Sequence, residues 1–125
     1  MSVVYTFADI QIEIGHNQAV LDHKLREMQE QRWVVLTAEN PWGEEFPVFI
    51  NKQRTGVLRD TLTQSGYVWQ EGIGQAEGLP PEVVFLILGI ELEDAAGLAY
   101  EMSQSDIVTG VLGGFAEVVS LHSNE

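Results

Sequence analysis

The chain of 125 residues has the length of one domain, and its composition excludes several classes of protein. It contains no cysteine, which removes disulfides, thiolate metal sites and thiol catalysis. Nineteen acidic residues stand against six basic ones, and a surface with a net charge of -13 repels nucleic acid and anionic membranes. The N-terminal residues lack the pattern of a secretory signal, and no apolar run reaches the ~20 residues that cross a bilayer. We therefore expect a cytoplasmic protein that binds no cofactor, metal, nucleic acid or membrane directly.

The first part of the chain predicts one strand and one helix before a central strand. Residues 4–14 read as a strand, because apolar and polar side chains alternate toward its end. Asn17 suits the N-cap of a helix whose apolar stripe contains Leu21 and Leu25. The consecutive apolar residues of segment 33–38 predict a strand that is buried on both faces and is therefore central in its sheet.

The remaining sequence predicts two further helices and four strands. Asn51 suits the start of the second helix, which should turn Val57 inward. The third helix follows a strand and has an acidic first turn, which suits the helix dipole. The strands are expected at residues 67–71, 83–90, 106–112 and 115–121. Residues 72–81 read as a flexible loop, and Gly113-Gly114 is typical of a hairpin turn.

These elements predict a single α+β domain over residues 1–125. About three helices should form a two-layer sandwich with a mixed, mostly antiparallel sheet of five to six strands. The last hairpin leaves an edge strand able to pair with a second copy, so the pattern is compatible with a homodimer.

Three motifs in the middle of the chain occur together. They are Thr37-Ala-Glu-Asn-Pro41, the series Asn51-x-x-Arg54-x-x-x-Leu58-x-x-x-Leu62-x-x-x-Gly66, and Glu82-Val-Val-Phe-Leu-Ile-Leu-Gly-Ile90. This combination resembles the bacterial family called domain of unknown function 3293. The resemblance covers roughly residues 33–112, including a helix that closes on Gln104, and leaves the strand and helix of residues 1–32 outside it. It implies a small α+β bacterial domain and supplies no activity.

Six residues around the end of the central strand form the candidate site for a ligand or partner. They are Asn40, Trp42, Asn51, Arg54, Glu82 and Gln104. Polar loops that follow a buried strand are a common place for ligands in α/β proteins. Asn51 and Arg54 are three residues apart, so they share a helix face. Free backbone N–H groups and a guanidinium at that position suit a phosphate or carboxylate.

Each candidate also has a purely structural interpretation. Arg54 then pairs with a neighbouring glutamate such as Glu44, and Asn51 only caps its helix. Trp42 is either a lid that stacks on a flat ligand or a side chain packed over the sheet edge. Glu82 is either a general base with a raised pKa or a solvated acid at the end of a strand.

The sequence favours a non-catalytic binding protein over an enzyme. No residues stand in a known hydrolase constellation, and Gly72-x-Gly74-x-x-x-Gly78 has the wrong spacing for a dinucleotide fingerprint. The expected partner is a protein or a small anionic ligand. One alternative is an acidic nucleic-acid mimic, bacterial or phage, that inhibits a DNA- or RNA-binding defence protein. The other is a small enzyme acting on a nucleotide-like or phosphorylated ligand, with Arg54 as anion clamp and Glu82 as acid/base.

Overall fold

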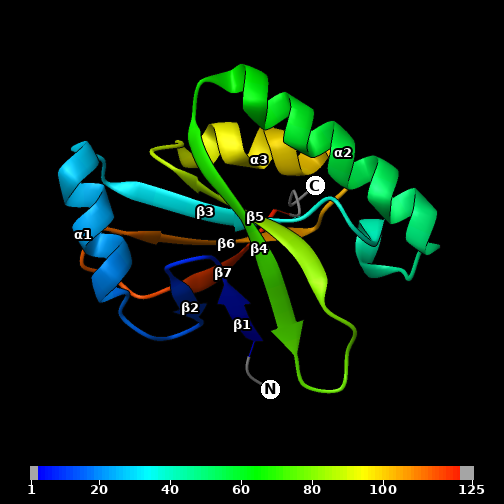
Figure 1. The fold of residues 1–125 in the computed structure, drawn as a ribbon, viewed down its shortest axis with the longest axis horizontal. Helices are drawn as coiled ribbons and strands as arrows, with labels where there is room; N and C mark the ends of the chain where they lie inside the picture. Colours follow the sequence, from blue (N-terminus) through cyan, green and yellow to red (C-terminus); the bar gives the residue numbers. More distant parts are fainter. Residues whose placement is uncertain (1–2, 122–125) are drawn as a thin grey trace.

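The computed structural model describes residues 3–121, which form a curled antiparallel sheet of seven strands with three α-helices (Figure 1). The elements in chain order are β1 (Val3–Thr6), β2 (Gln11–Glu13), α1 (Ala19–Met28), β3 (Arg32–Leu36), the 3-10 turn η1 (Pro41–Gly43), α2 (Val48–Ser65), β4 (Val68–Ala76), β5 (Glu82–Leu88), α3 (Leu92–Glu101), β6 (Asp106–Val111) and β7 (Glu117–Ser120). The strands lie in the order β2-β1-β4-β5-β3-β6-β7. The α+β class, the mostly antiparallel sheet and the central place of β3 are confirmed, whereas the strand number is seven rather than five to six.

The additional strand comes from the N-terminal segment, which forms a hairpin and not one continuous strand. β1 and β2 pair antiparallel, with Val4 opposite Glu13. The chain reverses between them, where the backbone N–H of Phe7 donates to the carbonyl of Ile10 (2.8 Å). These two residues are buried and belong to the core, whereas Ala8 and Asp9 between them are exposed. An alternation of polar and apolar residues does not distinguish one long strand from a hairpin, because each strand of the hairpin also buries one face.

β4 is longer than expected, because two glycines that suggested a loop lie within the strand. It pairs with β1 on one side and with β5 on the other. A Cβ atom at Gly72 would lie 2.4 Å from the ring of Phe7, and one at Gly74 would lie 2.9 Å from the ring of Tyr5. The glycines thus leave room for the rings of Tyr5 in β1 and of Phe7 directly after it to cross over β4, and only residues 77–81 form the loop.

The core has two parts, one on each face of the sheet. Trp33 and Leu86 face one side, where they pack with α1 and the β1–β2 hairpin. Val34 and Phe85 face the other side, where α2 and α3 cover the sheet (Figure 1). The two-layer expectation therefore describes α2 and α3 only, since α1 packs on the opposite face.

Neither predicted asparagine cap is found at a helix start. α1 follows Gln18, and the Asn17 side chain instead donates to the carbonyl of Gly113 (3.4 Å). α2 begins at Val48, so Asn51 lies in its first turn. Val57 is exposed rather than inward, whereas Leu58 and Leu62 are buried as expected. Within residues 3–121, no helix combines the length and apolar character needed to cross a membrane.

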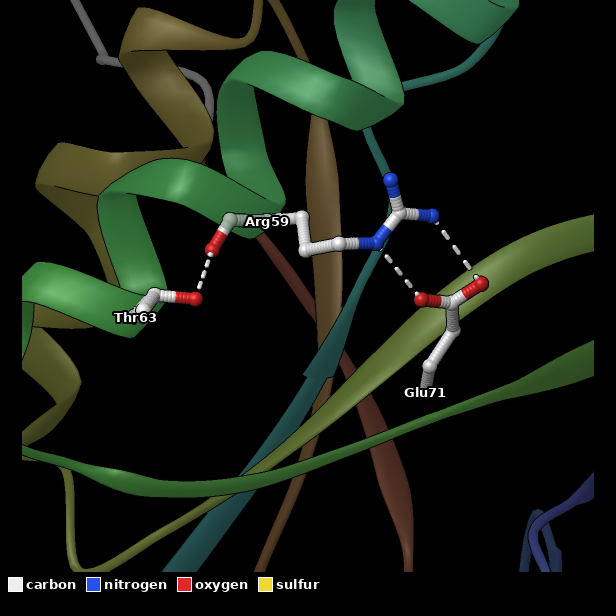
Figure 2. A network of polar contacts seen from close by, with 3 residues as sticks. All are labelled: Arg59, Thr63 and Glu71. Atoms are coloured by element: carbon white, nitrogen blue, oxygen red, sulfur yellow. Dashed lines mark hydrogen bonds and ion pairs between the residues drawn. The ribbon is translucent and has the colours of Figure 1, made fainter.

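A surface ion pair joins the middle of α2 to β4 (Figure 2). Nε and Nη2 of Arg59 donate to the two carboxylate oxygens of Glu71 at 2.9 and 3.1 Å. The hydroxyl of Thr63 donates to the carbonyl of Arg59 one turn earlier (2.8 Å). This bidentate contact fixes the side chains of the two elements relative to each other at the edge of the core.

Candidate functional site

Five of the six candidate residues meet where β3 ends and β5 begins, and Asn40 is the centre of their network. Its backbone N–H donates to Oδ1 of Asn51, and its Oδ1 accepts from Nδ2 of Asn51, both at 2.9 Å. Its Nδ2 donates to Oε2 of Glu82 at 3.0 Å. Oδ1 also accepts from the backbone N–H of Phe46 (3.0 Å), which draws the loop after β3 back onto α2. Three elements are thus joined through one asparagine.

Arg54 and Gln104 connect this network to the end of α3. Nε of Arg54 donates to the carbonyl of Ala38 (2.8 Å), and Nη2 donates to the carbonyl of Met102. Nε2 of Gln104 donates to the carbonyls of Glu39 (3.0 Å) and Met102 (3.2 Å). Among residues 3–121, no carboxylate lies within ion-pair distance of Arg54, so a glutamate is not what holds it.

Glu82 is half-buried and stands among other acidic groups. Burial raises the pKa of Glu82, and the charges of Glu39 and Asp106 add to the rise, while the hydrogen bond from Asn40 opposes it. Burial, followed by the charges of Asp106 and Glu82, also raises the pKa of Tyr5 to about 12. The described residues contain no cluster of three or more histidine, aspartate or glutamate side chains arranged to hold a metal ion. This end of the sheet is therefore an acidic environment that disfavours further negative charge.

Trp42, the sixth candidate, lies outside the hydrogen-bonded network and is 62% exposed. Its backbone N–H donates to the carbonyl of Ser103 (2.9 Å), which holds η1 against the end of α3. Together with Tyr100, Gln104 and Leu121 it lines a groove of about 420 Å³ beside α3. The large exposed fraction is what a contact residue requires, and it is not typical of a tryptophan packed over a sheet edge.

Backbone strain is concentrated around this groove. Asn40 (φ 49°), Trp42 (φ 60°) and Ser103 (φ 57°) adopt the left-handed conformation. Within residues 3–121, the one other non-glycine residue with positive φ is Gln29, which ends α1. Asparagine tolerates this conformation, but a bulky residue such as tryptophan pays of order 1 kcal/mol or more for it. Such strain persists where the surroundings enforce it, and it is concentrated at functional sites.

Two residues of this region were not among the sequence candidates. Glu39 directly precedes Asn40, and its Oε2 accepts from the backbone N–H of Val83 (2.8 Å). Its place inside the Thr37–Pro41 motif was an available signal. Tyr100 lies on α3 and is 79% exposed. The helical spacing of the buried Ala95 and Ala99 already places position 100 on the outer face, where an aromatic residue is unusual.

The fold and the site together define an α+β domain with a polar network at the end of its central strand and an aromatic groove beside it. The sequence pattern of the family described as "Protein of unknown function (DUF3293)" matches residues 36–107, which is more than half of the chain. The chain belongs to this family, as the resemblance implied. All six candidate residues lie within the matched range. No curated protein and no solved structure matches the chain.

Proposed function

We propose that this protein is a non-catalytic binding domain whose contact surface is the groove beside α3, with Trp42 at its rim. The observation that carries the proposal is the exposed indole of Trp42 on a strained backbone. Exposing a large apolar side chain is unfavourable, and holding it in a left-handed conformation adds a further cost. Both costs are explained if the indole contacts a partner.

In this proposal the polar network supports the contact surface. The side chains of Arg54 and Gln104 donate to main-chain carbonyls next to Asn40 and at the end of α3. The two walls of the groove are η1 and α3, and these hydrogen bonds fix the position of one wall relative to the other. Asn40, Asn51, Arg54 and Glu82 would therefore position the surface, while Trp42, Tyr100 and Gln104 would touch the partner. Tryptophan and tyrosine are the residues most enriched among binding hot spots.

A protein partner suits this surface better than a small anionic ligand. The lining of the groove contains no basic residue. The guanidinium of Arg54 already donates to two carbonyls, and Glu39 and Glu82 stand beside the same loop. An anion would meet repulsion there without a matching cation.

The raised pKa of Glu82 is the observation that favours the alternative of a small enzyme. A carboxyl group that stays protonated at higher pH can act as a general acid or base. Neither Glu82 nor Arg54 lines the groove, however, so the acid and the clamp of that hypothesis do not face the proposed contact surface. The enzyme is therefore the second candidate.

Site-specific photo-crosslinking tests the binding proposal. A benzoylphenylalanine at position 100, an exposed aromatic position of the groove, is expected to capture a discrete partner from cells that produce the protein. Adding Trp42→Ala should reduce that capture at least tenfold, because a hot-spot tryptophan contributes about 2 kcal/mol or more. The same photo-reactive residue at Phe115, which is 59% exposed on the β6–β7 hairpin, serves as the control. Equal capture at positions 100 and 115, or capture that ignores Trp42→Ala, would contradict the proposal.

A further inference from the structure

The surface next to the groove contains a second hollow of about 310 Å³. Its lining includes Tyr67, Glu93, Asp94 and Glu101. Gly97 lines both this hollow and the groove, so the two are adjacent and meet on the outer face of α3. A ligand that crosses α3 at this residue can occupy both at once.

Gly97 lies where the two hollows meet and has no side chain to separate them. It is exposed in the middle of α3, and a Cβ atom added there would meet nothing within 4 Å. Packing inside the protein therefore does not require glycine, which destabilises a helix by about 0.5–1 kcal/mol relative to alanine. The missing side chain leaves space for the main chain of another molecule to pass close to the helix.

The charge of this surface determines which kind of ligand can bind across α3. Glu93, Asp94 and Glu101 are exposed and give the second hollow a negative charge. Burial and the neighbouring Asp94 raise the pKa of Tyr67, whose hydroxyl lies 3.4 Å from Oδ2 of Asp94. The groove supplies the rings of Trp42 and Tyr100, and aromatic faces attract guanidinium and ammonium groups. Both hollows thus favour positively charged side chains.

We infer that the partner presents an extended, basic segment of its chain that crosses α3 over Gly97. One basic side chain enters the hollow formed by Glu93, Asp94 and Glu101, and a second lies on the rings of Trp42 and Tyr100. In an extended chain, side chains two residues apart point to the same side, which suits two neighbouring hollows. This inference rests on the proposed function and specifies the chemistry of the partner.

Fluorescence anisotropy with labelled decapeptides tests the inference. The probes are an alternating Arg-Ala decapeptide and its Gln-Ala and Glu-Ala counterparts. The Arg-Ala peptide is expected to bind the wild-type protein, with an affinity that falls as the salt concentration rises from 0.1 to about 1 M. The other two peptides should not bind measurably.

Matched variants separate this site from general attraction to an acidic protein. Gly97→Leu should weaken binding of the Arg-Ala peptide at least fivefold and yet raise the melting temperature, since leucine favours the helix. Gly56→Leu is the control, because Gly56 lies within α2 and also has nothing within 4 Å of an added Cβ atom. Glu101→Gln should weaken binding more than Glu77→Gln, which removes the same charge from the β4–β5 loop.

The possible results distinguish the inference from the proposed function. Equal binding of the Arg-Ala peptide to all variants would show attraction to the overall charge and would overturn the inference. Trp42-dependent crosslinking at position 100 without any peptide binding would also overturn it, while leaving the proposed function in place. Absence of both would reject the binding surface itself.

Discussion

Arg54 contributes to this fold by joining main-chain segments rather than by balancing charge. Its guanidinium donates to carbonyls of the loop after β3 and of the end of α3, while its own backbone belongs to α2. A side chain that satisfies two carbonyls is costly to remove, because hydrogen bonds from a charged donor contribute about 1.5–3 kcal/mol.

Arg54→Ala is therefore expected to lower the free energy of unfolding by about 2 kcal/mol and the melting temperature by roughly 8 °C. Arg59→Ala is the control, because the Arg59–Glu71 pair of Figure 2 lies at the surface and should contribute less than about 1 kcal/mol. Differential scanning calorimetry of both variants measures the difference. A nearly unchanged melting temperature for Arg54→Ala would instead support the anion-clamp interpretation from the sequence.

Glu82 gives the stability a pH dependence of known sign. Its pKa in the folded protein lies above 4.5, the usual value, which applies to the unfolded chain. Between pH 4.5 and the folded pKa, the folded state therefore binds a proton more readily than the unfolded chain. The stabilisation by this proton is complete below pH 4.5 and is lost as the pH rises through the folded pKa. At neutral pH the ionised carboxylate is therefore unfavourable where it stands.

Glu82→Gln is accordingly expected to melt at a higher temperature than the wild type at pH 7. A glutamine can still accept the hydrogen bond from Asn40 and adds no charge beside Glu39 and Asp106. The difference between the two proteins should shrink as the pH falls toward 4.5. Thermal unfolding of both proteins at half-unit pH steps measures this difference in melting temperature. A difference that stays constant with pH would refute the raised pKa of Glu82.

At the scale of elements, the contact between β3 and β6 depends on a glycine. Gly110 lies opposite Trp33 in the register of the two strands. A Cβ atom at Gly110 would lie 2.5 Å from Cζ2 of that indole. The missing side chain of Gly110 leaves the space that the indole of Trp33 occupies beside the neighbouring strand.

Gly110→Ala is expected to lower the free energy of unfolding by about 2 kcal/mol, because overpacking of a core costs roughly 1–3 kcal/mol. Gly56→Ala should change it in the opposite direction by up to about 1 kcal/mol, since alanine favours α2 and meets no neighbour there. Urea titrations of the two variants compare them directly. If Gly110→Ala leaves the free energy of unfolding unchanged, the indole of Trp33 can move aside.

The elements that could be predicted from the sequence are those with a local signal. The apolar run of β5, the spacing of Ala95 and Ala99 in α3, and the Gly113-Gly114 turn each predicted the observed element. The β1–β2 hairpin and the second half of β4 could not be predicted, because they depend on tertiary contacts and not on a local sequence signal. Gly72 and Gly74 pair with β5, and their lack of side chains is explained only by the rings of Phe7 and Tyr5 that lie across them.

At the scale of the molecule, the site combines segments that are distant in the sequence. The bond from Asn40 to Glu82 spans 42 positions, and the bond from Gln104 to Glu39 spans 65. The sequence pointed to Asn40, Glu82 and Gln104 because each follows or precedes a buried element, but it did not point to Glu39 and could not predict any of the partners. The pairing of Arg54 with carbonyls in particular has no sequence signal, since every residue has a carbonyl group.

The edges of the sheet bear on assembly. β7 lies at one end of the strand order and carries an exposed valine, Val118. An exposed edge of this kind can pair with a second copy, although the net charge of -13 opposes the approach of two identical chains. The homodimer stays a prediction.

The central place of β3 has a consequence for how the protein is made. The backbone carbonyl of Trp33 accepts a hydrogen bond from Thr109, 76 positions later in the chain, and both neighbours of β3 are translated after it. A ribosome therefore releases this largely buried strand long before its neighbours exist. Until β5 and then β6 emerge, the nascent polypeptide carries that strand without its partners, which is the period when chaperones protect a growing chain from aggregation.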